Sequence, residues 1–238
     1  MRRVVVMITL VVAMAASAAA QSGTFGGRYS NYATEVDSSI LGLGSFELDT
    51  GRESSLGLLG DSRSGMFVLS WNYDHDFEGG INLVEFIPIE FAEFSRDRGE
   101  IGVGLALVPF LDLLIGARLE QITIGGQRFL GEAIFDDLDL NHQAILFGAH
   151  AHSQTIRPIG WYVSVRGYIG SADVEVDGFE VSTDTTGLKL EGGIPIPVGL
   201  SGWEVTPGVE LETIDTDDLG LSFDTNRFFI NFVYNFGR

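Results

Sequence analysis

Apolar and polar side chains alternate along many stretches of about ten residues in this chain. In WYVSVRGYIG, Trp161, Val163 and Val165 fall on one face of an extended strand, and Ser164 and Arg166 fall on the other. A helix repeats about every 3.6 residues, so a strict period of two does not give it an apolar face. The alternation therefore predicts an all-β fold.

Ten stretches carry this pattern, and we expect each to form one strand of a single domain. Their lengths suit the roughly 9 to 11 residues that a tilted strand needs to cross a membrane. The least clear stretch, 81–94, is apolar on both faces and contains Pro88. Eight strands are an alternative, and twelve are another if TFGGRYSNYAT and SSLGLLG both pair. The expected strands lie near residues 39–48, 65–76, 81–94, 100–108, 111–123, 142–153, 160–170, 185–193, 202–213 and 226–236.

Periodicity alone does not decide whether the apolar face meets a protein core or lipid, but two features favour lipid. Glycines such as Gly102, Gly104 and Gly208 lie among the charges of the polar face, where a narrow lumen needs room. Aromatic residues gather near the ends of the apolar faces, as an interfacial girdle requires. These aromatic residues are Trp71, Tyr73, Trp161, Trp203, Tyr234 and Phe236.

The connections between the expected strands alternate between long and short, with one break at SRDRGE. The long ones include residues 125–141, 171–184 and 214–225, and the short ones include VPFLD and TIRPIG. Membrane barrels have long loops on one side and short turns on the other. We therefore expect a transmembrane antiparallel up-and-down β-barrel. A secreted soluble β-barrel that binds an apolar ligand is the alternative fold.

The first twenty residues have the composition of an export signal. MRR is followed by the apolar run VVVMITLVVAMA and by three alanines that end at Ala20, which predicts cleavage before Gln21. A membrane anchor is the alternative. The expected organisation is a signal peptide at 1–20, a polar N-terminal leader at 21–37, which could instead form a strand, and the barrel domain at 38–238. The chain has no cysteine, which excludes disulfides and lipoprotein anchoring.

Taken together, the signal, the strands, the sorted connections and the final FFINFVYNF resemble the small bacterial outer-membrane β-barrel superfamily. The resemblance implies a location in the outer membrane of a Gram-negative bacterium, among lipid and lipopolysaccharide. It also implies that the barrel assembly machinery reads the last strand, in which apolar residues fall at every second position. Gly237 and Arg238 displace this signal from the end of the chain. The assembly signal would comprise Phe228, Ile230, Phe232, Tyr234 and Phe236.

The charge balance is strongly acidic, with 33 Asp and Glu residues against 14 Lys and Arg residues and a net charge of −19. Nucleic acid is excluded as a partner, because phosphate contacts need clustered basic residues. FDDLDLN and DTDDLGLSFDT space their aspartates as calcium loops do, but neither completes the twelve-residue pattern. We expect solvated acidic loops, where divalent cations could bridge to lipopolysaccharide, and we expect no cofactor.

Histidines are concentrated in NHQAILFGAHAHSQ, where His142, His150 and His152 share one strand face. A metal would need a third ligand from a neighbouring strand, and a lone H-x-H is nonspecific, so we predict no metal site. Ser164 could approach His150 from an adjoining strand, but no G-x-S-x-G elbow surrounds it. We therefore expect no catalytic residues, and a membrane-embedded lipid-modifying enzyme is the alternative.

The expected lumen face collects charges of both signs, which must pair because an isolated buried charge is costly. An excess of glutamate would make an open path prefer cations. The most consistent function is a non-enzymatic structural or surface-interaction barrel, with a narrow cation-preferring pore as a further option. The predicted lumen network comprises Arg118, Glu120, His142, His150, His152, Arg166, Lys189, Glu191, Glu204, Glu210, Glu212 and Arg227.

Overall fold

The computed structural model of this chain is an all-β protein. It describes residues 22–38, 46–49, 53–76, 89–91, 94–124, 127–129, 132–135, 138–153, 160–176, 179–199, 202–217 and 219–237. Within these ranges there is no helix long and apolar enough to cross a membrane. The predicted signal peptide at 1–20 lies outside the described residues.

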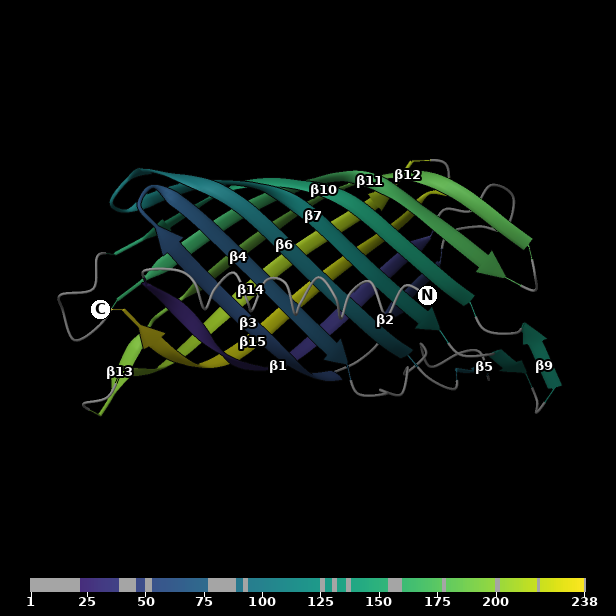
Figure 1. The fold of residues 1–238 in the computed structure, drawn as a ribbon. Coiled ribbons are helices and arrows are strands. Elements are labelled where there is room, and N and C mark those ends of the chain that lie inside the picture. Colours follow the sequence, from purple (N-terminus) through teal and green to yellow (C-terminus); the bar gives the residue numbers. More distant parts are fainter. Residues whose placement is uncertain are drawn as a thin grey trace.

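Ten long strands form a closed antiparallel barrel, seen from the side in Figure 1. Neighbours in sequence are neighbours in the barrel, and closure comes from the first and last strands, whose register runs from Gly23 opposite Phe236 to Ser38 opposite Leu221. The barrel strands are β1 (Ser22–Ser38), β3 (Glu53–Ser64), β4 (Phe67–Asp76), β6 (Phe94–Val108), β7 (Leu111–Ile124), β10 (Leu138–His152), β11 (Tyr162–Val176), β12 (Phe179–Gly193), β14 (Trp203–Thr216) and β15 (Leu221–Phe236).

Five short strands lie outside this set. Two of them extend the barrel wall: β2 (Phe46–Asp49) pairs with β1, and β13 (Ile196–Val198) pairs with β14. The other three form a separate small sheet, in the order β5 (Ile89–Phe91), β8 (Gln127–Phe129) and β9 (Glu132–Phe135). These three belong to the long connections at one end of the barrel.

The two ends of the barrel differ. At the terminal end, Ser22 of β1 lies beside the end of β15, and two-residue turns at 65–66 and 109–110 join β3 to β4 and β6 to β7. At the opposite loop end lie the long connections that carry β5, β8 and β9, at the right of Figure 1. In outer-membrane barrels the short turns face the periplasm and the long loops face outward. By this rule we expect the loop end to face outward.

The barrel is apolar outside and charged inside. Along β15, Phe228 is 70% exposed while its neighbour Arg227 is 1% exposed. The same alternation recurs along the other barrel strands, with exposed leucines, isoleucines and phenylalanines facing out. Water would penalise such a surface, whereas lipid requires it. The prediction of a transmembrane barrel is confirmed, and the soluble alternative is wrong.

The predicted number of ten strands is confirmed, but two of the segments differ. The expected leader at 21–37 is β1, and the connection that contains SSLGLLG is β3. The expected strand at 39–48 contributes only β2 within the described residues, and that at 81–94 contributes β5 and Phe94. Since β1 and β3 carry polar side chains such as Arg28, Tyr32 and Glu53 inward and Asn31 outward, their hydropathy barely alternates.

The loops expected at 171–184 and 214–225 are mostly strand, because β11 extends to Val176, β12 begins at Phe179 and β15 begins at Leu221. SRDRGE is likewise the first part of β6, and part of 125–141 forms β8, β9 and the start of β10. β11 has 15 residues. At about 3.3 Å per residue and a 45° tilt it rises about 35 Å, against an apolar band of about 25 Å. The strands therefore project beyond the lipid, where the outward face becomes acidic, as at Asp173 and Glu175, and apolar residues such as Val174 face inward.

Candidate functional site

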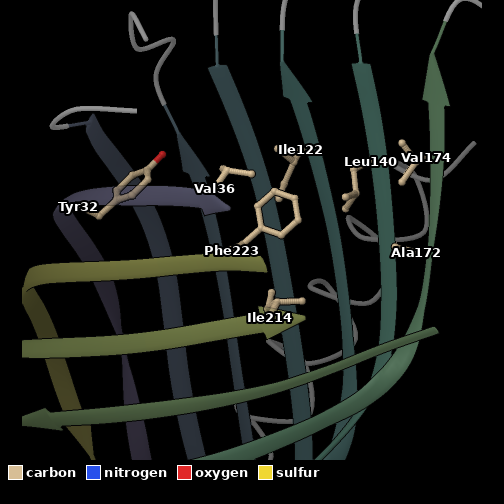
Figure 2. Packing of buried hydrophobic residues seen from close by; sticks show 8 residues of the cluster. All are labelled: Tyr32, Val36, Ile122, Leu140, Ala172, Val174, Ile214 and Phe223. Atoms are coloured by element: carbon tan, nitrogen blue, oxygen red, sulfur yellow. The ribbon is translucent and has the colours of Figure 1, made fainter. Parts of the chain in front are cut away.

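The interior of the barrel is layered along its axis. Nearest the loop end lies an apolar cluster of inward-facing side chains from six barrel strands, shown in Figure 2. Leu219 and Leu221 pack against this cluster. All of its members are buried, so protein fills the lumen at this level. The apolar cluster comprises Tyr32, Val36, Ile122, Leu140, Ala172, Val174, Ile214 and Phe223.

Below the apolar cluster lies a charged network centred on Arg98. Its Nη1 lies 2.7 Å from Glu210 Oε1, and its Nη2 lies 2.7 Å from Asp74 Oδ2. Glu212 Oε2 is a third partner at 3.3 Å. Arg98 and Glu210 are both completely buried. One guanidinium therefore binds a carboxylate of the neighbouring strand β4 and, across the lumen, carboxylates of β14.

Arg118 is a second node of the charged network. Its Nη2 lies 2.7 Å from Glu120 Oε2, and its Nη1 contacts Glu212. The guanidinium also lies over the ring of Tyr168, 4.5 Å from the ring centre. Arg96 completes this node through Glu120 and through Glu212 Oε2, the latter at 2.6 Å. Glu120 thus binds Arg96 and Arg118, and Glu212 binds Arg96, Arg98 and Arg118.

Glu100 receives charged donors from β11 and β12. Lys189 Nζ lies 2.7 Å from its Oε1, and Arg166 Nη1 lies 2.5 Å from its Oε2. The Tyr168 hydroxyl donates to the same carboxylate at 3.0 Å. A buried carboxylate is tolerated when it is paired and its lone pairs are occupied. Glu100 meets both conditions.

The remaining part of the charged network depends on the space that Gly208 leaves beside it. Gly208 faces Phe229 across the β14–β15 pair, and a side chain at this glycine would collide with the phenyl ring. The Arg28 guanidinium stacks 4.1 Å above that ring, and its Nη2 lies 2.9 Å from Glu191 Oε1. The small residue thus makes room for an aromatic ring and a buried ion pair.

The twelve residues of the predicted lumen network all lie on the inner face, although not in one site. Sequence reasoning missed several members, some because they lie in segments expected as leader or connection, and others, such as Asp74 and Asp112, although they lie in expected strands. Arg96, Arg98 and Glu100 continue the alternation of the inward-facing Gly102 without a break, and that phase could have identified them. The missed inner-face residues are Arg28, Glu53, Asp74, Asp76, Arg96, Arg98, Glu100 and Asp112.

A cavity of about 480 Å³ occupies the terminal end of the lumen. His150, His152, Asp112 and Arg63 are among its lining residues. Arg63 Nη2 lies 2.7 Å from Asp112, and His152 Nε2 lies 3.4 Å from the same carboxylate. The cavity is therefore polar on this side, and Arg28, Glu100, Arg166 and Glu191 of the charged network also line it.

The three histidines do not converge. The rings of His150 and His152 lie 5.4 Å apart at the cavity, whereas His142 is deeper and contacts Glu120 at 3.3 Å. In the described ranges, no group of three or more His, Cys, Asp or Glu side chains is arranged to hold a metal ion. Ser164 is the cross-strand neighbour of His150, but its buried hydroxyl has no hydrogen-bond partner. The arrangement therefore lacks the serine–histidine hydrogen bond of an activated nucleophile.

The outer face of the barrel carries a second charged feature, at the loop end. Where the strands pass beyond the apolar band, ten acidic side chains face outward, and the described barrel strands have no outward-facing lysine or arginine. The two Asp-rich segments contribute strand residues to this acidic collar, in addition to any loop. The acidic collar comprises Glu35, Asp37, Asp97, Asp139, Asp173, Glu175, Glu180, Asp184, Asp215 and Asp224.

The predicted assembly residues all lie on the outward face of β15. Phe228, Ile230, Phe232 and Tyr234 are exposed to the lipid side, and Phe236 pairs with Gly23 at the end of the strand. Trp203 stacks on Phe232 with ring centres 4.8 Å apart. The last strand therefore has a continuous apolar outward face near the terminal end.

No protein-family model and no curated protein matches the sequence. Among solved structures, the outer-membrane protease OmpT of Escherichia coli is similar with a TM-score of 0.56 at 8% identity, over 90% of this chain and 96% of that chain. The translocator domain of the autotransporter NalP of Neisseria meningitidis gives 0.47 at 10% identity, over 95% and 94%. At such identities the likeness shows the fold alone. The chain therefore has the fold of a bacterial outer-membrane β-barrel protein, in agreement with the resemblance in its sequence.

Proposed function

We propose that this protein is a non-enzymatic outer-membrane barrel with a structural or surface-interaction role, and that its lumen does not conduct ions. The observation that carries the proposal is the charged network, in which Arg98, Arg118 and Glu210 are completely buried in the middle of the lumen. The apolar cluster lies between this network and the loop end. The narrow cation-preferring pore is therefore the less favoured role.

The energetics of ion pairs support a closed lumen. Removing one partner of a buried pair costs about 3 to 5 kcal/mol, because the other charge is left without compensation. A permeating cation would have to displace Arg98 from Glu210 and then cross the apolar cluster. Both steps oppose conduction, although the inner face is rich in glutamate.

The acidic collar supports a role at the cell surface. Its carboxylates lie where the strands leave the lipid, and no outward lysine or arginine of the described strands neutralises them. We propose outer-membrane lipid and lipopolysaccharide as its neighbours, with divalent cations bridging the acidic groups. Electrostatic attraction at such a surface is weakened by salt.

Export and assembly complete the proposal. Cleavage before Gln21 would place the mature terminus next to Ser22, where β1 begins. The barrel assembly machinery would then read the outward aromatic residues of β15 and close the barrel against β1. β1, the segment that the sequence predicted as a leader, is thus the strand against which β15 closes the barrel.

Planar-bilayer recording of the refolded full chain tests the proposed function. We expect no discrete conductance steps, and insertion is verified by the heat-dependent mobility of the barrel on gels. Discrete steps that shrink in the Glu210→Gln and Glu212→Gln variants would instead establish the pore. A lipid-modifying activity lost in both His150→Ala and Ser164→Ala would establish the enzyme.

A further inference from the structure

Three side chains meet between the charged network and the loop end. The Tyr32 hydroxyl oxygen lies 2.7 Å from Glu53 Oε2 and 2.5 Å from Asp76 Oδ2. The three residues come from β1, β3 and β4 and are 1%, 3% and 2% exposed, respectively. Water is therefore not available to separate the two carboxyl groups.

The hydrogen atoms of this triad do not balance if both carboxyl groups are ionised. A phenol has one hydrogen to donate, and an ionised carboxylate can only accept. Tyr32 can thus donate to Glu53 or to Asp76, but not to both. The second contact forms only if that carboxyl group carries a proton and donates it to the phenol oxygen.

The charges of the inner face lead to the same count. Apart from the Arg63–Asp112 pair at the cavity, the inner face of the described barrel strands has seven basic and ten acidic side chains. Two of the three surplus acids, Asp61 and Glu204, line the cavity at the terminal end. The third surplus acid therefore belongs to the interior. The basic groups are Arg28, Arg96, Arg98, Arg118, Arg166, Lys189 and Arg227, and the acidic groups are Glu53, Asp61, Asp74, Asp76, Glu100, Glu120, Glu191, Glu204, Glu210 and Glu212.

The charged groups that face the triad are engaged elsewhere. Arg227 of β15 lies over the Tyr32 ring at 4.8 Å, and its Nη1 lies 3.3 Å from Asp74 of β4. Arg96 of β6 pairs with Glu120 and Glu212. The second oxygens, Glu53 Oε1 and Asp76 Oδ1, are buried and have no hydrogen-bond partner. Neither arginine therefore forms an ion pair with Glu53 or Asp76.

We propose that Glu53 and Asp76 bind one proton between them through Tyr32, and that this proton holds the loop end of the lumen closed. Tyr32 belongs to both the triad and the apolar cluster. The shared proton therefore links the ends of β3 and β4 to the apolar cluster. Loss of the proton places two carboxylates beside one phenol in a site without water. Their repulsion separates the side chains and loosens the apolar cluster.

The direction of the pH effect follows from proton binding. The folded barrel holds a proton at this site that the unfolded chain releases at the same pH. Stability falls with rising pH wherever the native state binds more protons. The triad therefore contributes its full stabilisation only below about pH 4, where the unfolded chain is also protonated, and loses that contribution progressively as the pH rises to the value at which the folded site releases its proton.

Infrared spectroscopy of the refolded full chain in lipid detects the proton directly, because a protonated carboxyl group has its own carbonyl band. We expect the wild type to show this band at neutral pH and to lose it on alkalinisation. Glu53→Gln and Asp76→Asn should each remove the band, whereas the matched control Glu204→Gln should retain it. A wild type without the band, or a band retained in both triad variants, would overturn the proposal.

A second measurement covers the case in which a triad variant fails to fold. Thermal unfolding of the wild type should shift to lower temperature as the pH rises from about 5 to alkaline values, and Tyr32→Phe should lose most of that shift. An equal shift in both proteins would count against the triad. The closing role rests on the closed lumen proposed above, but the infrared band does not, so the two ideas can fail separately.

Discussion

Arg98 and Glu210 form an ion pair of 2.7 Å in the middle of the lumen, and neither side chain is exposed. The pair joins β6 to β14, strands that are not hydrogen-bonded neighbours in the barrel. Such cross-lumen pairs hold opposite walls together. In the function proposed above, they also block an ion path at this level.

Replacing Arg98 with methionine should destabilise the barrel strongly. Glu210 and Asp74 would each lose a charged donor while remaining buried, which costs about 3 to 5 kcal/mol. The free energy of unfolding in urea, measured on refolded protein in lipid vesicles, tests this. Arg63→Met is the matched control, because this cation pairs with Asp112 at the open cavity, where a partly exposed pair contributes only about 0 to 1 kcal/mol. Equal losses in the two variants would contradict the layered interior.

Leu188→Arg should be costly because the side chain faces lipid. Leu188 is 57% exposed on the outer face of β12, and an arginine near the bilayer midplane costs about 2 to 4 kcal/mol. Asp184→Arg lies on the same face of the same strand, in the acidic collar, and should cost much less. Vesicle-based unfolding of both variants measures the difference. A larger loss of stability for Asp184→Arg than for Leu188→Arg would contradict the assignment of Leu188 to the lipid and of Asp184 to the acidic collar.

Phe236→Ala should reduce the amount of barrel that reaches the outer membrane while leaving the refolded protein nearly as stable as the wild type. The reason is that its predicted role lies in assembly, and its strand pairing with Gly23 is a backbone interaction. Quantitative immunoblots of outer-membrane fractions report the yield. Phe147→Ala, another lipid-facing substitution in the middle of β10, serves as the control and should assemble normally. Normal yield of Phe236→Ala would argue against the assembly signal.

The absence of cysteine allows the orientation to be tested by labelling. Asp184→Cys at the loop end should react with a membrane-impermeant thiol reagent on intact cells. His152→Cys lines the terminal-end cavity and should react only after the outer membrane is permeabilised. The reverse order of reactivity would mean that the barrel is inserted the other way.

The sequence predicted the fold where one strand face meets lipid, because only there does hydropathy alternate. Leu188 and Lys189 on β12, or Phe228 and Arg227 on β15, differ sharply, and their inner and outer faces could be assigned. Beyond the lipid the contrast weakens or reverses. β1 there carries Thr34 and Val36 inward and Glu35 and Asp37 outward, so the pattern of a lipid-facing apolar strand face is lost.

The partners within the lumen were not predictable in the same way. Glu100 lies 89 residues from Lys189 in sequence and contacts it across the barrel. Alternation assigns a residue to a face, but the register and closure of all strands decide which charges meet. The Tyr32 triad depends on a still finer relationship, since it joins the ends of β3 and β4 to a strand that was expected as a leader.

Charged side chains line the inside of this barrel, and apolar side chains meet lipid. The closed lumen, the assembly signal and the shared proton all depend on this arrangement. Nitroxide labels placed singly at residues 144 to 147 of β10 test it by their accessibility to oxygen, which is concentrated in lipid. We expect high accessibility at Ile145 and Phe147 and low accessibility at Ala144 and Leu146, because only the first two face outward. High oxygen accessibility at Ala144 and Leu146, with contact of Ile145 and Phe147 to a water-soluble nickel reagent, would contradict the account.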